Sequence, residues 1–301
     1  MKRSSALVSY SESSDSDSDH APNVPEPKKR KLPALASSLT VPVPVDDPSK
    51  HQGRIRTTPH VEGQWAAYVY IPILLQEEEN KKLRGLVRRV IRRAKDVEPA
   101  LQVLGTSAPA NGNEVADSAV PMELHVSLTR PFYLRAHQRE DVKRAMRAVA
   151  KTHLPFTASF ATLAELTNDE RTRTFLCMEV GAGHTEFQKL SDALTPTLRA
   201  FRQKEYYDQP RFHASFAWAL LNHPSQPSTP APPGTPTPEP DAVSKESPSP
   251  PICTPIAALP DDLVSSLQAE FGSALASQAG VFDVQTVRVR IGKDVSEWAL
   301  G

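Results

Sequence analysis

LHVSL at residues 124–128 and FHASF at residues 212–216 repeat one pattern, in which a histidine and a serine two positions apart lie between apolar residues. Successive side chains of a β-strand point to opposite faces of a sheet. The histidine and serine of each motif would therefore share one face, and the apolar residues would share the other. The pattern predicts two half-buried strands that each present His-x-Ser on the open face.

Two such strands, lying side by side, would bring two imidazoles and two hydroxyls to one cleft. One neutral imidazole can accept a proton while one imidazolium donates a proton, because histidine titrates near ~6.5. Hydroxyl groups can donate hydrogen bonds to phosphoryl oxygens, where negative charge builds up. The set suits cleavage of RNA without a metal ion, with the 2′-hydroxyl as nucleophile and a 2′,3′-cyclic phosphate as product. The predicted catalytic residues are His125, Ser127, His213 and Ser215, and geometry alone leaves the acid and base roles exchangeable.

One His-x-Ser motif carries little information, because the chain has nine histidines and chance matches are common. A lone histidine on a strand is also more often structural than catalytic. Two copies, 88 residues apart (213 − 125), each between apolar residues on a predicted strand, are much harder to obtain by chance. The pair therefore favours an active site over two unrelated structural histidines.

Strands and helices alternate along the rest of the chain. The predicted strands alternate apolar and polar residues, which favours antiparallel sheets with one covered face and an α+β fold. The predicted strands cover 65–73, 122–132, 156–163, 174–180, 211–221 and 281–292. The predicted helices cover 75–95, 135–153, 184–206 and 261–277, the last N-capped by Asp261 and Asp262.

Two segments have compositions that do not favour a packed core. Residues 1–62 include an acidic, serine-rich stretch and the basic cluster KKRK at 28–31, which is typical of a nuclear localisation signal. Residues 222–258 are rich in proline, and 13 of the 29 prolines lie between Pro224 and Pro260. We expect a disordered tail, a catalytic domain over 63–301 with a disordered insertion at 222–258, and a location in the nucleus.

The balance of 35 basic and 35 acidic residues identifies no partner by bulk charge. Locally, the predicted helix carries eight basic residues between positions 81 and 95, which fits either an RNA-facing surface or a solvated face. Cys177 and Cys253 fit a reducing compartment and are not expected to pair. No apolar run long enough to span a membrane is present, and we expect a monomer without metal or cofactor.

The chain resembles the 2H phosphoesterase superfamily, whose hallmark is two His-x-Ser/Thr motifs, and within it the U6 small nuclear RNA phosphodiesterase family. The resemblance runs from about Trp65 to the C-terminus, without the proline-rich segment. It is carried by ELHVSLTRPFYLRAHQ (123–138), NDERTRTFLCMEV (168–180) and FRQKEYYDQPRFHASFAWAL (201–220).

The resemblance implies a fold of two lobes related by a pseudo-two-fold axis, each with an antiparallel sheet and one His-x-Ser strand. It implies 3′-to-5′ trimming of the oligouridine end of U6 RNA, with His125 as base, His213 as acid and both serines on the phosphate. Tyr207 would stack on a terminal base, and the backbone from Gln209 through Arg211 to Phe212 would contact the substrate. The turn at 168–170 departs from the family, because Asn168, Asp169 and Glu170 stand where the family often has glutamine.

Two alternatives remain open at this level. One is another activity of the same superfamily, such as a 2′-5′ RNA ligase or a cyclic phosphodiesterase. The other is a nuclear RNA-binding module without catalytic activity.

Overall fold

The structure is a computed structural model that describes residues 48–54, 58–59, 61–105, 123–222 and 253–301, all within one structural unit. Most of the predicted tail, with its basic cluster at 28–31, lies outside the described residues, as does 223–252. Within the tail, residues Pro48–His51 form a short 3-10 helix, η2. Strand β1 then begins at Gln64, one residue before the start of the strand predicted at 65–73.

Among the described residues, ten β-strands form one sheet, and eight of them pair antiparallel along a path with the order β10-β9-β1-β3-β7-β6-β5-β8. Two short strands lie off this path, β4 beside β1 and β2 beside β7. The strands are β1 (Gln64–Leu74), β2 (Gln102–Val103), β3 (Glu123–Ser127), β4 (Phe132–Arg135), β5 (Phe156–Thr167), β6 (Arg173–Val180), β7 (His213–Leu220), β8 (Val281–Val284), β9 (Thr286–Ile291) and β10 (Asp294–Ala299).

The path has two halves of four strands that meet where β3 pairs with β7. Val126 on β3 is the register partner of Ala214 on β7. A two-fold axis between these two residues would superpose His125 on His213 and Ser127 on Ser215. The α+β class, the two antiparallel halves and their pseudo-two-fold relation are confirmed, and the predicted two sheets are joined into one hydrogen-bonded path.

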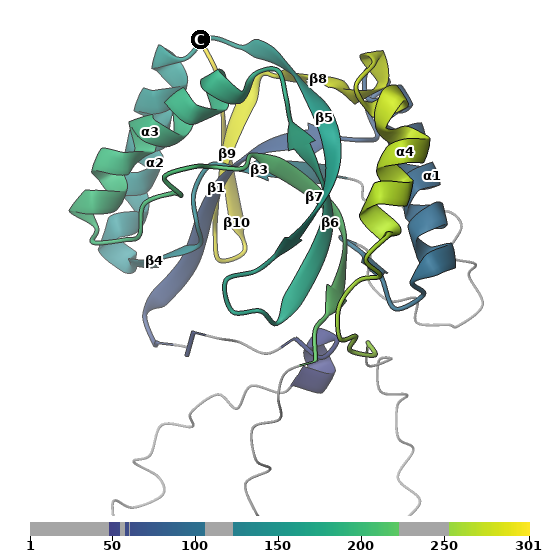
Figure 1. The fold of residues 1–301 in the computed structure, drawn as a ribbon. Coiled ribbons are helices and arrows are strands. Elements are labelled where there is room, and N and C mark those ends of the chain that lie inside the picture. Colours follow the sequence, from purple (N-terminus) through teal and green to yellow (C-terminus); the bar gives the residue numbers. More distant parts are fainter. Residues whose placement is uncertain (1–47, 55–57, 60, 106–122, 223–252) are drawn as a thin grey trace, which may run out of the picture. The chain divides into compact units, whose positions relative to one another are not determined.

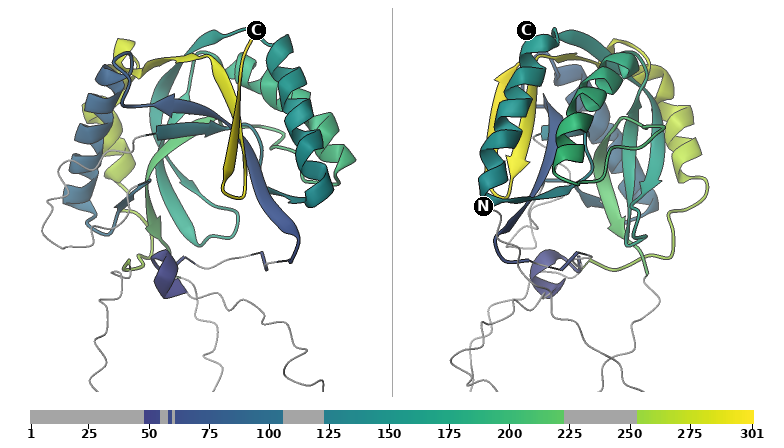
Figure 2. Two further views of the ribbon diagram at one scale, coloured as in Figure 1. Left: turned by 180° about the vertical axis from the view of Figure 1, so that it is seen from behind. Right: turned by 90° about the vertical axis from the view of Figure 1, so that its left-hand side faces the viewer.

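The described part of the chain has four α-helices, which pack in two pairs at opposite sides of the strands (Figure 1; Figure 2 shows the same pairing from behind). One pair is α1 with α4, and α4 contacts β5. The other is α2 with α3, and α2 contacts β9 and β10. No helix among the described residues is long and apolar enough to cross a lipid bilayer. The helices are α1 (Lys81–Val97), α2 (Arg139–Thr152), α3 (His184–Ala200) and α4 (Leu263–Leu275).

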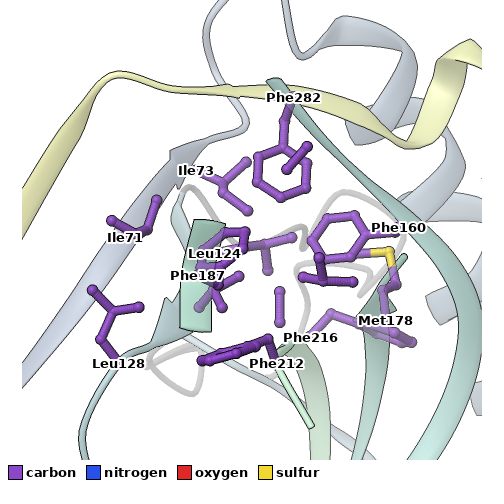
Figure 3. Close-up of a cluster of buried hydrophobic side chains, with 14 of the residues drawn as sticks. Ile71, Ile73, Leu124, Leu128, Phe160, Met178, Phe187, Phe212, Phe216 and Phe282 are labelled. Atoms are coloured by element: carbon purple, nitrogen blue, oxygen red, sulfur yellow. The ribbon is translucent and has the colours of Figure 1, made fainter. Parts of the chain in front are cut away.

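The hydrophobic core lies on the face of the strands opposite to the His-x-Ser side chains. Leu124 and Val126 on β3 are almost fully buried, while the intervening His125 is half-buried. Aromatic rings of β5, α3, β7 and β8 fill the centre, where Phe160 stacks on Phe282 with ring centroids 4.7 Å apart (Figure 3). Residues of all four helices belong to this one core. The strand alternation thus fixes which face is left for chemistry.

Several predicted elements are interrupted where a strand changes its partner or loses a donor. The predicted strand 122–132 is two strands, because Pro131 precedes β4 and proline has no N–H for a ladder. The predicted strand 281–292 is divided at Gln285, since β8 pairs with β5 whereas β9 pairs with β1. Strand β2 has only two residues and was not predicted.

Helix boundaries also differ from the sequence expectation. Helix α1 begins at Lys81 rather than near 75, because turns precede it and the Asn80 side chain donates to the carbonyl of Leu74 at 3.0 Å. Helix α3 ends at Ala200, well before the predicted end at 206. Asp262 is the N-cap of α4 but its carboxylate accepts no capping hydrogen bond, so that part of the prediction is wrong.

The last residues of the predicted proline-rich insertion belong to the fold. The Ile256 N–H donates to the Leu220 carbonyl at 2.9 Å, and the Asn222 N–H donates to the Ile256 carbonyl at 2.7 Å. Cys253 is buried against Trp218 and Leu220. The prediction of disorder is therefore wrong for 253–258, because this segment satisfies backbone groups at the end of β7.

Candidate active site

The pairing of β3 with β7 brings the two His-x-Ser motifs together. Because Val126 lies opposite Ala214 in an antiparallel ladder, His125 lies opposite Ser215 and His213 lies opposite Ser127. All four side chains are half-buried, in contrast to the buried residues between them. The two imidazoles and two hydroxyls thus form a compact set on the open face.

Neighbouring strands extend this set into a row of polar side chains across the open face. Tyr70 on β1 is the register partner of Ser127, and Arg288 on β9 is the partner of Tyr70. On the other side, Glu179 on β6 is the partner of His213, and Thr162 on β5 is the partner of Glu179. Sequence reasoning missed Tyr70, Glu179 and Arg288, because only pairing between distant strands places them in the row.

His213 has a defined orientation. Its Nδ1 lies 2.5 Å from the carbonyl oxygen of Arg211, so Nδ1–H donates there and Nε2 is left for chemistry. Burial lowers the pKa of His213, while the bond to the Arg211 carbonyl and the charge of Glu179 act in the opposite direction. Glu179 also accepts a hydrogen bond from the Arg211 guanidinium at 2.6 Å. The Arg211 carbonyl and Glu179 thus favour the imidazolium form of His213, whereas the charge of the Arg211 guanidinium, like burial, lowers the pKa.

His125 has a different environment. Its ring packs edge-on against Tyr70 with centroids 5.5 Å apart and lies 6.0 Å from the ring of Tyr68. Burial, and secondarily the charge of His213, lowers the pKa of His125 to about 4. Burial also raises the pKa of the Tyr70 hydroxyl, which is therefore a neutral donor beside the site. The two-fold related histidines are thus electrostatically unequal, with His125 held neutral.

Cys177 lies opposite Ser215 but does not add a nucleophile to the site. Its thiol is buried, its Sγ donates to the Ala164 carbonyl at 3.4 Å, and burial raises its pKa to about 12. Cys177 and Cys253 are both free, as predicted. In the described part of the chain, no group of three or more His, Cys, Asp or Glu side chains could hold a metal ion.

Tyr207 lies in a cluster that three loops contribute. The Arg130 guanidinium lies over the Tyr207 ring, 4.2 Å from its centroid, and also pairs with Asp169. The Tyr207 hydroxyl donates to Asp169 at 3.3 Å. With 46% of Tyr207 exposed, its ring retains accessible surface for a ligand. Asp169 belongs to the turn at 168–170, where the sequence departs from the family, and its carboxylate holds Arg130 and Tyr207 together.

The other predicted substrate residues lie in three different environments. Gln209 is exposed, and Arg211 is exposed but paired with Glu179. The Phe212 ring is 1% exposed and packs on Tyr206 and Phe187, so the ring itself cannot contact a substrate. Its carbonyl accepts a hydrogen bond from the Val180 N–H at 2.8 Å, so this backbone group is also engaged.

A cleft of about 730 Å³ lies beside the row, at the end that Arg288 occupies. Arg288 pairs with Glu123 at 2.6 Å and with Glu297. The cleft is bounded by the end of β1, the first residues of α1 and the segment from η5 (Gln278–Gly280) to β9. Its position makes it a continuation of the open face that carries the histidines.

An antiparallel sheet whose two central strands each present His-x-Ser about a pseudo-two-fold axis is the arrangement of a 2H phosphoesterase. The model of a protein family described as "HVSL: Uncharacterised conserved protein" matches residues 30–299. The letters HVSL in this description are also the one-letter sequence of residues 125–128 of this chain.

Curated relatives carry a more specific name. The chain is 31% identical to U6 snRNA phosphodiesterase 1 of Drosophila melanogaster over 71% of this chain and 82% of that protein. It is 30% identical to the Xenopus laevis protein of that name over 71% and 80% of the two chains. The match to the Mus musculus protein, 31% identical, spans 59% of this chain and only 58% of the relative. The chain belongs to the HVSL family and to the family of the U6 snRNA phosphodiesterases.

Solved structures with a related arrangement include Kluyveromyces marxianus Usb1, with a TM-score of 0.47, 13% identity and coverage of 78% of this chain and 98% of that chain. Escherichia coli LigT, solved with 3′-AMP, has a TM-score of 0.35 and 13% identity, with coverage of 79% of this chain and 98% of that chain.

Proposed function

We propose that this chain is an RNA phosphodiesterase that trims the 3′ end of U6 snRNA in the 3′-to-5′ direction without a metal ion. The observation that carries the proposal is the register of β3 and β7, which sets His125 opposite Ser215 and His213 opposite Ser127. The names of the curated relatives support U6 snRNA as the substrate.

The proposed reaction is a transesterification. His125 accepts the proton of the 2′-hydroxyl, whose oxygen attacks the adjacent phosphorus. The bond from phosphorus to the 5′ oxygen of the terminal nucleoside breaks, and His213 donates its proton to that oxygen. The shortened RNA retains a 2′,3′-cyclic phosphate, which water can open to a 3′ phosphate. Ser127 and Ser215 donate hydrogen bonds to the non-bridging oxygens.

The unequal environments of the two histidines support this assignment of roles. A base must be neutral before the reaction, and His125 is held neutral by burial. An acid must be protonated, and Glu179 and the Arg211 carbonyl both favour protonated His213. A bound phosphodiester anion would raise the pKa of each histidine, because opposite charge stabilises imidazolium.

The pH dependence of kcat/KM is expected to be bell-shaped and displaced to the acid side of neutrality. The rate rises as pH increases through the pKa of His125, about 4, because His125 must lose its proton to act as base. It falls as pH increases through the pKa of His213, which burial lowers from 6.5. Glu179→Gln should move the descending limb to lower pH and leave the ascending limb in place. Movement of the ascending limb instead would reverse the two roles.

Tyr207 is proposed to stack on the terminal base. Tyr207→Ala should raise KM by roughly tenfold to a hundredfold, because base–aromatic stacking contributes about 1–3 kcal/mol. Tyr207→Phe is the matched control, since it keeps the ring and removes only the exposed hydrogen bond to Asp169. Steady-state kinetics on an oligouridine substrate measure both variants. Equal effects of the two substitutions would point to the hydroxyl rather than to stacking.

A direct test uses purified protein and an RNA that ends in oligouridine with a 3′-hydroxyl, in the presence of EDTA. The proposal expects shortening by one nucleotide at a time and a cyclic or opened 3′ phosphate on the product. Joining of RNA ends would indicate ligase activity instead. Binding without shortening would indicate an RNA-binding module and would overturn the proposal.

We place this activity in the nucleus on the basis of the KKRK cluster at 28–31, which lies outside the described residues. A fluorescent fusion in which these four residues are replaced by glutamine tests the proposal. Unchanged nuclear accumulation would show that the cluster does not direct import.

A further inference from the structure

Helix α1 concentrates positive charge on its exposed face. It carries eight lysines and arginines and one acidic residue, Asp96. Its apolar residues point the other way and are buried in the core that α4 shares. The basic residues are Lys81, Lys82, Arg84, Arg88, Arg89, Arg92, Arg93 and Lys95, and the buried residues are Leu83, Leu86, Val87, Val90, Ile91 and Ala94.

The basic residues form two rows along the helix. With 3.6 residues per turn, positions 82, 89 and 93 lie on one side, where Lys82 bonds Gln278 and Arg93 pairs with Glu270 of α4. Positions 81, 84, 88, 92 and 95 lie on the other side, and we call them the outer row. Arg84 and Arg88 of the outer row make no ion pair with any residue that the structure describes. Arg84 and Arg88 therefore present positive charge that no described acidic side chain pairs with.

Repulsion between the basic side chains of the outer row lowers the stability of the isolated helix. Like charges four residues apart, as at Arg84 and Arg88, destabilise a helix. Helix α2 shows how this chain balances charge elsewhere, because Lys143 pairs with Glu140 and Arg144 pairs with Asp141 within one turn. Arg84 and Arg88 have no such acidic partner among the described residues, so this part of the outer row resembles a surface for a polyanion more than an ordinary solvated helix face.

The outer row begins at the cleft that lies next to the catalytic face. Lys81 and Lys82 line the cleft that continues the catalytic face past Pro72 and Arg288, and Pro72 is the register partner of His125. The cleft also contains the acidic residues 77–79, and Glu78 pairs with Lys81. The part of the outer row available to a polyanion therefore starts at Arg84, one turn beyond the cleft.

We propose that the outer row of α1 is a second RNA-binding surface, which holds the body of the RNA through its phosphates while the 3′ end occupies the catalytic face. The inference rests on the proposed function for the identity of the polyanion. An anionic membrane fits less well, because the apolar face of α1 is buried and cannot enter a bilayer. Contacts to phosphates carry no base preference, so this surface adds affinity for long RNA without sequence selectivity.

The test compares two RNAs with the same oligouridine 3′ end, one short and one extended upstream by an unpaired, single-stranded segment. The last 2′-hydroxyl before the terminal phosphodiester is replaced by hydrogen, so that binding is measured without cleavage by fluorescence anisotropy. Arg84→Gln/Arg88→Gln should weaken binding of the long RNA by roughly tenfold and reduce its salt slope by about 1.4, the value for two contacts to a single strand. Binding of the short RNA should not change.

The matched control is Arg147→Gln/Lys151→Gln, which removes two exposed charges from α2 and should leave both RNAs unaffected. Cleavage of the unmodified short RNA at the wild-type rate shows that the active site of the α1 variant is intact, so a failure of the proposed function would be seen separately. Unchanged affinity for the long RNA, or equal losses for both RNAs or both variants, would overturn the inference. The inference would also be overturned if the Arg84→Gln/Arg88→Gln variant bound the long RNA normally but lost binding to anionic vesicles or to an acidic protein.

Discussion

His125→Ala and His213→Ala are each expected to lower kcat/KM on RNA by about 10²–10⁴-fold, the usual contribution of a positioned general acid or base. Each substitution removes one of the two proton-transfer groups that the β3–β7 register brings together. The mechanism requires both groups in one turnover, so the effects of the two single substitutions should not add in the double variant. Single-turnover cleavage of an oligouridine measures the loss.

A substrate with an activated leaving group separates the two roles. The p-nitrophenyl ester of uridine 3′-phosphate releases a weakly basic phenolate that needs no proton, whereas its 2′-hydroxyl still has to lose one. His213→Ala should therefore recover most of its activity on this ester, and His125→Ala should not. The reverse pattern would exchange the roles of the two histidines.

His137→Ala is the control for general effects of losing a histidine, because His137 is exposed in η4 (Ala136–Gln138), outside the site. It should cleave RNA at the wild-type rate. Thermal melting of all three variants should show folded protein. A catalytic variant that melts like the wild type and still cleaves RNA normally would contradict the proposed function.

Ser127→Ala and Ser215→Ala are each expected to lower kcat by about 10²–10³-fold, the loss seen when one donor to a developing oxyanion is removed. The hydroxyls lie opposite the histidines of the partner strand, where the non-bridging oxygens would sit. Because these bonds strengthen as charge builds up, kcat should fall more than KM rises.

Ser127→Thr and Ser215→Thr are the matched controls, since threonine keeps the hydroxyl and favours a strand. Both should retain most of the activity that the alanine variants lose. If the alanine and threonine variants were equally impaired, the serines would serve packing rather than phosphate binding.

Much of the architecture could be predicted from local patterns. The alternation around His125 and His213 predicted both strands and the face on which each histidine lies, and the helical periodicity predicted the buried side of α1. Boundaries were less predictable where tertiary contacts override local preference. The division at Gln285 follows from a change of partner strand, and the order at 253–258 follows from pairing with the end of β7.

Within the candidate site, the sequence identified the side chains with reactive chemistry but not the groups that tune them. Glu179 and Tyr70 are unremarkable strand residues until the register sets them beside His213 and Ser127. The Phe212 ring faces the core, as the alternation around His213 predicted.

The sequence by itself determined that the histidine and serine of each motif share one strand face, because a period of two is a property of the local backbone. Only the tertiary structure decided that Val126 lies opposite Ala214, so that each histidine faces the serine of the other motif. A shift of one residue in this register would exchange the faces, and the packing of distant residues in the core prevents it. The same long-range packing makes the two histidines unequal, since burial holds His125 neutral while Glu179 and the Arg211 carbonyl favour the charged form of His213.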